Sequence, residues 1–504
     1  MKIKNILFIQ PFTSKKEQIS ENILVWSIYL ENYLKRKLPK LKFALLYLPS
    51  LIRKKETILK IVQNKNFLYR EMDVLISRLR FNVDDKTLIC LSGSTTSTFL
   101  FSKLILEYFQ QQYPKSIVVF GGIHASACSN DFLYPKSPVD YIVKGEGEIS
   151  LYKLIKEDIK KHDVPITITG IPLKNLDDLP SIDFSLFDPY IENYDLLGIN
   201  LSRGCPFSCN FCLENQLSSF HPNVASWRPY SPKRAIKEVN NMINYGLEHN
   251  IKAFSFYDPI FGMRRKWLED FFELYDQNHY SIFVEPKLDI LNQSLLKKLI
   301  HGGFVNWYGL ESYSKEMLLI MGKTNDPTKY LKNFREVCKI HKKEGGVFGI
   351  NTIHNYPGEK KESLVETFDC LHKLARENLS NTILFNITKY NHFPGTYLYN
   401  NFTNFEKKYG AKVYFPKWWT DFNLIENGAC FVRPSSSLSL RDGINLYTEE
   451  YVEFLELNFK MMKSIENNFP STIMKGIQMR MGVKKLTERR ERQFNQLDDM
   501  QIEI

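Results

Sequence analysis

The sequence predicts an α/β protein in three parts: an N-terminal doubly wound, Rossmann-like parallel sheet, a partial (β/α)6 TIM-type barrel, and a mostly helical C-terminal region. Short apolar segments alternate with longer amphipathic segments up to about residue 400, which indicates parallel strands joined by crossover helices. Glycine- and serine-rich loops follow several candidate strands, at the end of a parallel sheet where ligands bind. The length of 504 residues is typical of about three domains.

Residues 1–160 form the predicted N-terminal domain, in which strands and helices alternate. The candidate strands are 5–9, 43–48, 87–91, 116–120 and 139–143. The candidate helices are 21–36, 55–80, 99–112 and 148–160. Residues 161–195 contain prolines, aspartates and little periodicity, so we expect a linker that runs over a surface.

The loops after the last three of these strands combine glycine with small or polar residues. Glycine lets the backbone approach a ligand closely, and small hydroxyl groups can hydrogen-bond its polar atoms. The residues that we expect to line a ligand there are Ser92, Gly93, Ser94, Gly121, Gly122, His124, Gly145 and Glu146.

Residues 196–400 form the predicted barrel. The candidate strands are 197–202, 253–257, 282–285, 305–310, 347–352 and 383–388, and amphipathic helices are expected at 232–247, 265–277, 327–343 and 361–377. Eight strand–helix units close a full TIM barrel, so six predict a partial one. Active sites of such barrels lie on the loops that follow the strands.

Three cysteines lie in the loop after the first barrel strand. Cys205, Cys209 and Cys212 have the spacing Cys-x3-Cys-x2-Cys. Three thiolates can hold three irons of a [4Fe–4S] cluster, and this loop has neither a fourth cysteine nor a histidine. The fourth iron would therefore be open to a ligand that is not a side chain. A zinc site or three unrelated thiols are the alternatives, but structural zinc takes four ligands and this spacing is uncommon for zinc.

This cysteine spacing, with Phe211 before the last cysteine, resembles the signature of the radical S-adenosylmethionine (SAM) superfamily. The resemblance implies that the open iron binds the amino and carboxylate groups of SAM. It also implies that one electron from the cluster cleaves SAM to a 5′-deoxyadenosyl radical, and that Phe211 lies near the adenine.

Motifs after later barrel strands resemble those of the same superfamily and keep their order. They are 309–312 (GLES), 355–359 (NYPGE) and 393–399 (FPGTYLY), with Asn355 where glycine is usual. The resemblance places Glu311 near the amino-acid end of SAM, where a carboxylate suits an ammonium; a salt bridge at the barrel rim is the alternative role. The candidate SAM contacts are Phe211, Asp258, Glu311 and Asn351.

Residues 121–125 (GGIHA) and 139–148 (VDYIVKGEGE) resemble the cobalamin-binding domain that precedes many radical SAM domains. The resemblance implies a cobalamin that lies face-on between this domain and the barrel. The Asp-x-His-x-x-Gly motif of domains that ligate cobalt through histidine is absent from the sequence. We therefore expect no histidine ligand from that motif. The alternatives are a loop-structuring role for His124, and a domain that keeps the fold without binding cobalamin.

These resemblances predict a cytoplasmic, cobalamin-dependent radical SAM methyltransferase. It would methylate an unactivated carbon of a natural-product, lipid or peptide substrate and take electrons from a donor such as flavodoxin or ferredoxin. A related enzyme that cyclises or rearranges its substrate without methyl transfer is the alternative, and a non-catalytic sensor is a minor one. A methylthiotransferase is disfavoured, because only Cys90 and Cys128 precede the signature and such enzymes carry three further cluster cysteines.

The remaining features exclude some partners and leave others open. The net charge of +11 is spread widely, with denser basic regions at 35–60 and 475–492 that we interpret as solvated helix faces, so a nucleic-acid partner is not expected. No stretch has the apolar length of a membrane span. Residues 401–504 contain an aromatic segment and an expected helix at 447–465, which would cap the barrel or pack against its open side.

Overall fold

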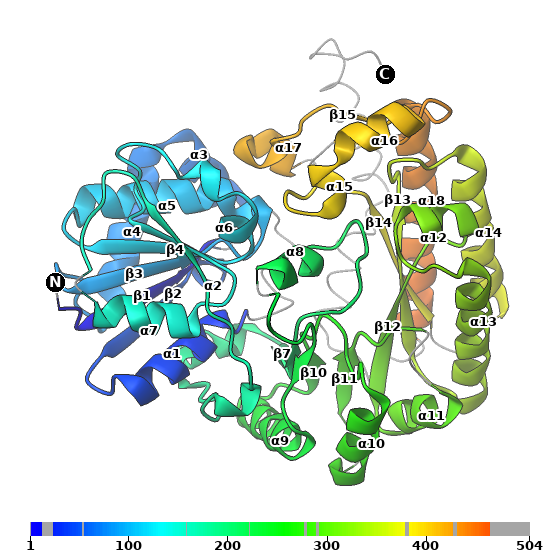
Figure 1. The fold of residues 1–504 in the computed structure, drawn as a ribbon, viewed down its shortest axis with the longest axis horizontal. Coiled ribbons are helices and arrows are strands. Elements are labelled where there is room, and N and C mark those ends of the chain that lie inside the picture. The colour runs from blue at the N-terminus through cyan, green and yellow to red at the C-terminus, as the bar shows by residue number, and fades with distance from the viewer. Residues whose placement is uncertain are drawn as a thin grey trace. The chain divides into compact units, whose positions relative to one another are not determined.

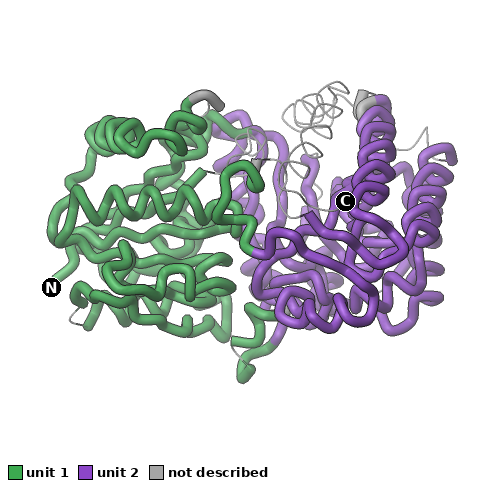
Figure 2. The backbone as a smooth tube through the Cα atoms, turned by 90° about the horizontal axis from the view of Figure 1, so that it is seen from above, with its two compact units in different colours: residues 1–194, 216–225, 417–429 green, residues 195–215, 226–416, 430–504 purple. Residues whose placement is uncertain are grey.

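The computed structural model describes residues 2–12, 24–52, 55–157, 159–220, 222–276, 280–288, 292–377, 383–426 and 431–463, and these form two compact units (Figure 2). Unit 1 comprises Met1–Tyr194, Gln216–Ala225 and Lys417–Ala429. Unit 2 comprises Asp195–Asn215, Ser226–Pro416 and Cys430–Ile504. The expected linker 161–195 thus belongs almost wholly to unit 1, and so does a short part of the expected C-terminal region.

Unit 1 is built on a six-stranded parallel sheet of order β2-β1-β3-β4-β5-β6. The strands are β1 (Asn5–Gln10), β2 (Lys42–Tyr47), β3 (Thr87–Ser92), β4 (Ile117–Gly121), β5 (Tyr141–Lys144) and β6 (Ile166–Thr169). The order reverses between β1 and β3, which confirms the doubly wound fold. The sequence analysis missed β6, a four-residue edge strand that is mostly exposed.

The helices of unit 1 cover both faces of this sheet, with α4 and α5 on one face and α1 and α7 on the other (Figure 1). They are α1 (Trp26–Lys37), α2 (Leu48–Leu51), α3 (Lys55–Gln63), α4 (Lys65–Arg78), α5 (Phe99–Gln112), α6 (Ile123–Ala127) and α7 (Glu148–Lys156). The expected helix 55–80 is divided at Asn64. The Asn64 side chain accepts hydrogen bonds from the backbone of Asn66 and Phe67 at 3.0 and 3.2 Å, so it begins α4 as an N-cap.

Short 3-10 turns complete unit 1, together with α17 (Phe422–Glu426). They are η2 (Thr96–Thr98), η3 (Ser129–Asp131), η4 (Leu176–Asp178), η5 (Ser185–Phe187), η6 (Ile191–Asn193) and η7 (Trp418–Thr420). Residues 176–194 pack against β2: the Tyr47 ring lies 5.9 Å from Phe187 and 5.8 Å from Tyr190, measured between ring centroids. This segment is therefore part of the core of unit 1.

Unit 2 is built on a second six-stranded parallel sheet of order β14-β13-β12-β11-β10-β7, the expected partial barrel. Its strands are β7 (Leu196–Ile199), β10 (Ala253–Phe256), β11 (Ser281–Val284), β12 (Phe304–Glu311), β13 (Phe348–His354) and β14 (Ile383–Lys389). Helices lie along its outer face (Figure 1). The longer ones are α9 (Pro232–Glu248), α10 (Arg265–Leu274), α11 (Gln293–His301), α13 (Pro327–Glu344) and α14 (Lys361–Glu377).

Shorter elements connect or flank these units. They are α8 (Glu214–Ser219), α12 (Lys315–Ile320), α15 (Tyr397–Asn400), α16 (Phe402–Tyr409), and the two-residue strands β8 (Ser202–Arg203), β9 (Arg228–Pro229), β15 (Lys412–Val413) and β16 (Val432–Arg433).

The two faces of the second sheet have different cores. On the outer face, strand residues such as Tyr308 and Ile350 pack with residues of α13 and α14. On the inner face a small apolar cluster contains strand residues only, among them Val305 and Leu384. Because side chains alternate between faces, Trp307 and Asn351 also belong to the inner face.

The C-terminal helix α18 (Leu440–Lys463) covers β14, the edge strand of the barrel sheet. The Asn458 side chain accepts from the Phe385 backbone N–H at 2.8 Å and donates to its carbonyl at 2.7 Å. An edge strand exposes unpaired backbone groups, so α18 supplies partners that a further strand would supply in a closed barrel. The expected tail and basic region beyond residue 463 lie outside the described residues. Within those ranges, every helix is too short or too polar to cross a membrane.

Candidate active site

The cysteine loop begins just after β7, at the carboxyl end of the barrel sheet. Asp258, which follows β10, fixes the chain there. Its Oδ1 accepts from the Leu201 and Ser202 backbone N–H groups at 2.6 and 3.1 Å, and its Oδ2 accepts from Ser202 Oγ at 2.8 Å. Burial raises the pKa of Asp258 to about 7, although these hydrogen bonds act against the increase. The predicted contact of Asp258 with SAM stays a prediction; the hydrogen bonds themselves give it a positioning role.

Asn210, between the second and third cysteines, ties the loop to other parts of unit 2. Its backbone N–H donates to the Met321 carbonyl at 2.9 Å, and its side chain donates to the Ile320 carbonyl at 2.8 Å. Its own carbonyl accepts from Leu398 N–H at 2.9 Å, at the start of α15. The loop is therefore held on two sides by elements that follow later barrel strands.

The sulfur atoms of Cys205, Cys209 and Cys212 are too widely spaced to share one ion. They are not among the groups of described side chains whose ligand atoms all lie within 4.8 Å of one another. Two thiolates on one tetrahedral zinc lie only about 3.8 Å apart, given Zn–S bonds of about 2.3 Å. The wider spacing fits a cluster, in which each thiolate binds a different iron. Burial raises the pKa of all three thiols, so a cationic centre is needed to hold them as thiolates.

A buried ion pair lies beside the cysteine loop. Lys323 Nζ, beyond α12, is 2.8 Å from Oε1 of Glu311 at the end of β12. Burial acts to lower the pKa of Lys323, but the neighbouring Glu311, Tyr330 and Cys209 outweigh this effect and raise it well above its usual value. Lys323 Nζ also lies 6.0 Å from the centroid of the Phe211 ring. Phe211 and Glu311, two candidate SAM contacts, thus both lie beside Lys323. The sequence analysis did not identify Lys323 as a site residue.

Glu311 reaches this position through an irregular end of β12. The pairing of β12 with β13 shifts between Gly309 and Glu311, and Glu311 has a left-handed backbone with φ 66°. A side chain at Gly309 would occupy the space of the Glu311 carboxylate and the Lys323 ammonium. The motif 309–312 therefore needs its glycine to make room for the ion pair.

Asn351 and Glu285 add polar groups at the same end of the sheet. Asn351 pairs in register with Gly309 on one side and Asn386 on the other, and its Oδ1 accepts from Asn386 Nδ2 at 3.0 Å. Glu285 follows β11, and its pKa is raised by burial and by the charge of Glu311, with Lys323 acting against this. Of the predicted SAM contacts, Glu311 and Asn351 thus lie on the neighbouring strands β12 and β13, whereas Phe211 lies in the cysteine loop beside Lys323.

The glycine-rich loops of unit 1 meet at the carboxyl ends of β3, β4 and β5. Gly93 N–H donates to the Gly121 carbonyl at 2.8 Å, and Gly145 N–H donates to Ser126 Oγ at 2.9 Å. Gly122 has φ 92° and ψ −169°, a conformation that is essentially restricted to glycine. A Cβ atom there would lie 2.6 Å from Ser92 Oγ and 2.9 Å from the Gly93 carbonyl oxygen. At these glycines no side chain covers the backbone, so a large ligand can approach it closely.

Two of the polar residues predicted to bind cobalamin already have partners within unit 1. Ser94 Oγ accepts from Gln10 Nε2 at 3.1 Å, and Gln10 Oε1 in turn accepts from Trp26 Nε1 at 2.7 Å. Glu146 Oε2 accepts from the Leu173 N–H at 3.2 Å. Their predicted contacts with cobalamin stay predictions, and Gln10 joins the same sheet edge although no sequence motif marks it.

The side chain of His124 packs in the interior of unit 1. It is fully buried, with its ring 4.7 Å from Phe99 and 5.9 Å from Trp419 between centroids. This burial favours the loop-structuring alternative for His124, and its predicted contact with cobalamin stays a prediction. The backbone supports this role, because His124 N–H donates to the Gly93 carbonyl at 2.9 Å.

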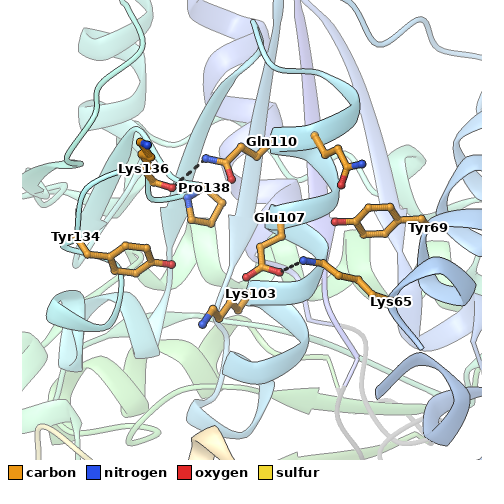
Figure 3. Close-up of a pocket in the computed structure, with 9 residues that line it drawn as sticks. Lys65, Tyr69, Lys103, Glu107, Gln110, Tyr134, Lys136 and Pro138 are labelled. Atoms are coloured by element: carbon orange, nitrogen blue, oxygen red, sulfur yellow. Dashed lines mark hydrogen bonds and ion pairs between the residues drawn. The ribbon is translucent and has the colours of Figure 1, made fainter. Parts of the chain in front are cut away.

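A pocket of about 400 Å³ lies elsewhere in unit 1, between α4, α5 and residues 134–138 (Figure 3). Its polar lining includes the ion pair of Lys65 with Glu107, at 2.6 Å, and the hydrogen bond of Gln110 to the Lys136 carbonyl, at 3.1 Å. None of the predicted cofactor residues lines this pocket.

Comparison with known proteins agrees with the geometry of the cysteine loop. Residues 199–371 match the radical SAM superfamily. The chain is 25% identical over 379 residues to an uncharacterized methyltransferase of Pyrococcus horikoshii, which covers 71% of this chain and 77% of the relative. It is 24% identical over 283 residues to an anaerobic magnesium-protoporphyrin IX monomethyl ester cyclase of Synechocystis sp., which covers 53% of this chain and 53% of the cyclase, about half its length.

A solved structure shares the fold of both units. It is the cobalamin-dependent SAM radical enzyme OxsB with aqua-cobalamin and SAM bound, with a TM-score of 0.62, 15% identity, and coverage of 99% of this chain and 76% of that one. At this identity the likeness concerns the fold. Together with the superfamily match and the cysteine loop, it shows that the chain is a radical SAM enzyme with the fold of a cobalamin-dependent member of that superfamily.

Proposed function

We propose that the protein is a cobalamin-dependent radical SAM methyltransferase that methylates an unactivated carbon of a natural-product, lipid or peptide substrate. One observation carries the proposal: the cysteine loop lies at the carboxyl end of the barrel sheet, beside Phe211 and the ion pair of Glu311 with Lys323. The methyltransferase of Pyrococcus horikoshii supports it as a relative. An electron donor such as flavodoxin or ferredoxin is part of the proposal.

The three cysteines would hold the cluster, and the glycine loops of unit 1 would hold cobalamin. When bound, the cluster supplies the electron that cleaves SAM, and cobalamin supplies a carrier for the methyl group. The protein then contributes orientation, charge and the exclusion of water.

The charges near the cysteine loop suit SAM. With both carboxylates ionised, Glu285, Glu311 and Lys323 together carry one net negative charge, and SAM brings an ammonium and a sulfonium. Lys323 also favours the thiolate of Cys209, because its charge lowers the pKa of that thiol against the effect of burial. We expect Glu311 to accept from the ammonium of SAM while Lys323 holds its other side.

The cobalamin part of the proposal rests on backbone and fold. Gly122 admits no side chain, and the loops after β3, β4 and β5 converge on one edge of the sheet. We expect no cobalt ligand from His124, because its side chain is buried within unit 1. This agrees with the absence of the Asp-x-His-x-x-Gly motif from the sequence.

Reconstitution of the full chain without oxygen tests both parts. After addition of iron, sulfide and hydroxocobalamin and removal of unbound material, we expect four irons and about one cobalt per chain. Four irons without retained cobalt would overturn methyl transfer through cobalamin. Absence of a cluster, under conditions that load a control radical SAM enzyme, would overturn the central proposal.

A second candidate is a cobalamin-containing enzyme that forms a ring without methyl transfer. The Synechocystis cyclase supports it, because the alignment covers half of this chain. SAM with a labelled methyl group distinguishes the two: a methyltransferase transfers the label to its product, whereas a cyclase product loses hydrogens and carries no label. A sensor would bind the cofactors and leave SAM intact.

A further inference from the structure

Three potential metal ligands converge in unit 1, on helix α6 and the turn that follows it. His124 lies in α6, Cys128 ends that helix, and Asp131 ends η3. One ligand atom from each of these three side chains lies within 4.8 Å of the other two. Their spacing of four and then three residues brings the side chains to one side of the turn.

The distances suit a single small cation. His124 Nε2 lies 3.3 Å from Asp131 Oδ2. Two ligands that each lie about 2.0 Å from a tetrahedral zinc ion are separated by roughly 3.3 Å. The cluster cysteines, by contrast, do not form such a tight group. The geometry at His124 is therefore that of a site for one ion.

The imidazole of His124 supplies independent evidence. It is fully buried, yet neither of its ring nitrogens has a hydrogen-bond partner within the described parts of the chain. The approach of Asp131 at 3.3 Å is a close contact without the geometry of a hydrogen bond. Buried polar atoms almost always have partners, and an ion between His124 and Asp131 would give one to Nε2.

Neighbouring groups fix the ligands as outer partners do in metal sites. Trp419 Nε1, in η7, donates to Asp131 Oδ2 at 2.7 Å, and its ring lies 5.9 Å from the His124 ring. Such hydrogen bonds orient a ligating carboxylate. The charge of Lys417 acts on both Cys128 and Asp131 and favours their ionised forms.

We propose that His124, Cys128 and Asp131 bind one zinc ion in unit 1. Imidazole nitrogen, thiolate sulfur and carboxylate oxygen are all zinc ligands, and a water molecule would complete the tetrahedron. Each protein–zinc bond forms at a lone pair, and the Cys128 thiol releases its proton to solvent when the sulfur–zinc bond forms. No oxidant or reductant is required.

The ion would hold together two segments that are far apart in the sequence. Its ligands lie in residues 124–131, and Trp419, which holds Asp131, lies in residues 417–429 of the same unit. The same histidine is bonded through its backbone to Gly93, whose Cβ position would lie 3.1 Å from the His124 Cβ atom. Zinc binding would thus stabilise the conformation of the glycine loops through His124, whether or not those loops bind cobalamin.

The test must separate this site from the cluster cysteines, which can themselves take up zinc when the cluster is absent. The full chain with Cys205, Cys209 and Cys212 all replaced by Ala serves as the background. It is stripped with a chelator, loaded with zinc without cobalamin, and titrated against a chromophoric competitor. We expect one tightly bound zinc per chain, measured by elemental analysis.

Variants in that background locate the ion. Cys128→Ser and Asp131→Asn should each weaken zinc binding about 100-fold or more, since even outer partners of a metal ligand contribute 10- to 100-fold. Cys370→Ser, a half-buried cysteine of unit 2, is the matched control and should leave zinc affinity unchanged. Absence of bound zinc in the background chain, or equal affinity in the Cys128, Asp131 and control variants, would overturn the proposal.

Discussion

The ammonium of Lys323 lies 2.8 Å from the carboxylate of Glu311, and both side chains are largely buried beside the cysteine loop. A buried pair of this kind is held at a cost in desolvation, so it is weak evidence for stability alone. Its position beside Phe211 and Cys209 points to a role in ligand binding. The pair neutralises one carboxylate and leaves Glu285 to set the net charge of the group.

Replacing Glu311 tests this role. Glu311→Gln should weaken SAM binding to the cluster-loaded chain roughly 10- to 100-fold, because a hydrogen bond to a charged group contributes about 1.5–3 kcal/mol. The measurement is the equilibrium Kd for SAM, with iron counted in the same sample. The double variant Glu311→Gln with Lys323→Met avoids an unpaired buried charge and should show the same weak binding. Glu316→Gln is the control, because that carboxylate forms an exposed pair with Lys360. Equal SAM affinity in the Glu311 variant and this control would remove Glu311 from the binding site.

A methyl group at Gly122 should abolish retention of cobalamin and spare the cluster. Gly122→Ala meets Ser92 Oγ at 2.6 Å and forces a backbone conformation that alanine scarcely adopts. Gly345→Ala is a matched control: its φ is also positive, at 73°, but the added methyl group has open space. Cobalt and iron are counted after reconstitution and desalting. We expect wild-type iron in both variants and loss of most of the cobalt in Gly122→Ala alone; normal cobalt in that variant would show that the ligand lies elsewhere.

Local sequence patterns predicted both sheets well, because buried parallel strands are continuous apolar runs. The helix α14 begins and ends where its amphipathic pattern does. The missed strand β6 is an exposed edge that depends on β5 for its pairing. The expected helix 55–80 is divided because one side chain, Asn64, caps the start of α4.

Side-chain environments were harder to predict than elements. A motif placed His124 in the correct loop, yet only the three-dimensional packing with Phe99 and Trp419 shows that its ring points into the core. Lys323 and Asn458 carry no motif. Lys323 meets Glu311 beyond the intervening helix α12, and Asn458 lies 73 residues from its partner Phe385. Contacts of this kind depend on tertiary structure, which no local pattern encodes.

The stability of unit 2 should fall as the pH falls below about 6.5. His354 is fully buried against the Phe368 ring, and burial lowers its pKa to about 3. The unfolded chain then binds a proton at a pH where the folded chain does not, so the contribution is complete above pH 6.5 and is lost on acidification. The loss between pH 6.5 and 5 is about 2 kcal/mol. Urea unfolding of the cluster-free chain at several pH values measures it. His354→Leu should reduce this dependence, whereas Leu371→Ala, a change in the same core that removes no titratable group, should not. A slope unaffected by His354→Leu would place the titration elsewhere.

Asn458 should be needed to keep α18 on the barrel. Its side chain is 5% exposed and satisfies both backbone groups of Phe385 on the edge strand. Asn458→Ala leaves a buried N–H and a buried carbonyl without partners, which costs about 2–4 kcal/mol. Hydrogen exchange localises the effect: the amides of β14 should exchange faster in the variant, while those of β12 should not change. Asn386→Ala, on the same strand but exposed, is the control and should leave both rates near those of the wild type. If β14 stays equally protected in Asn458→Ala, the packing of Phe454 and the hydrogen bond of Tyr447 to the Ile387 carbonyl are sufficient to hold the helix, and the hydrogen bonds of Asn458 add little.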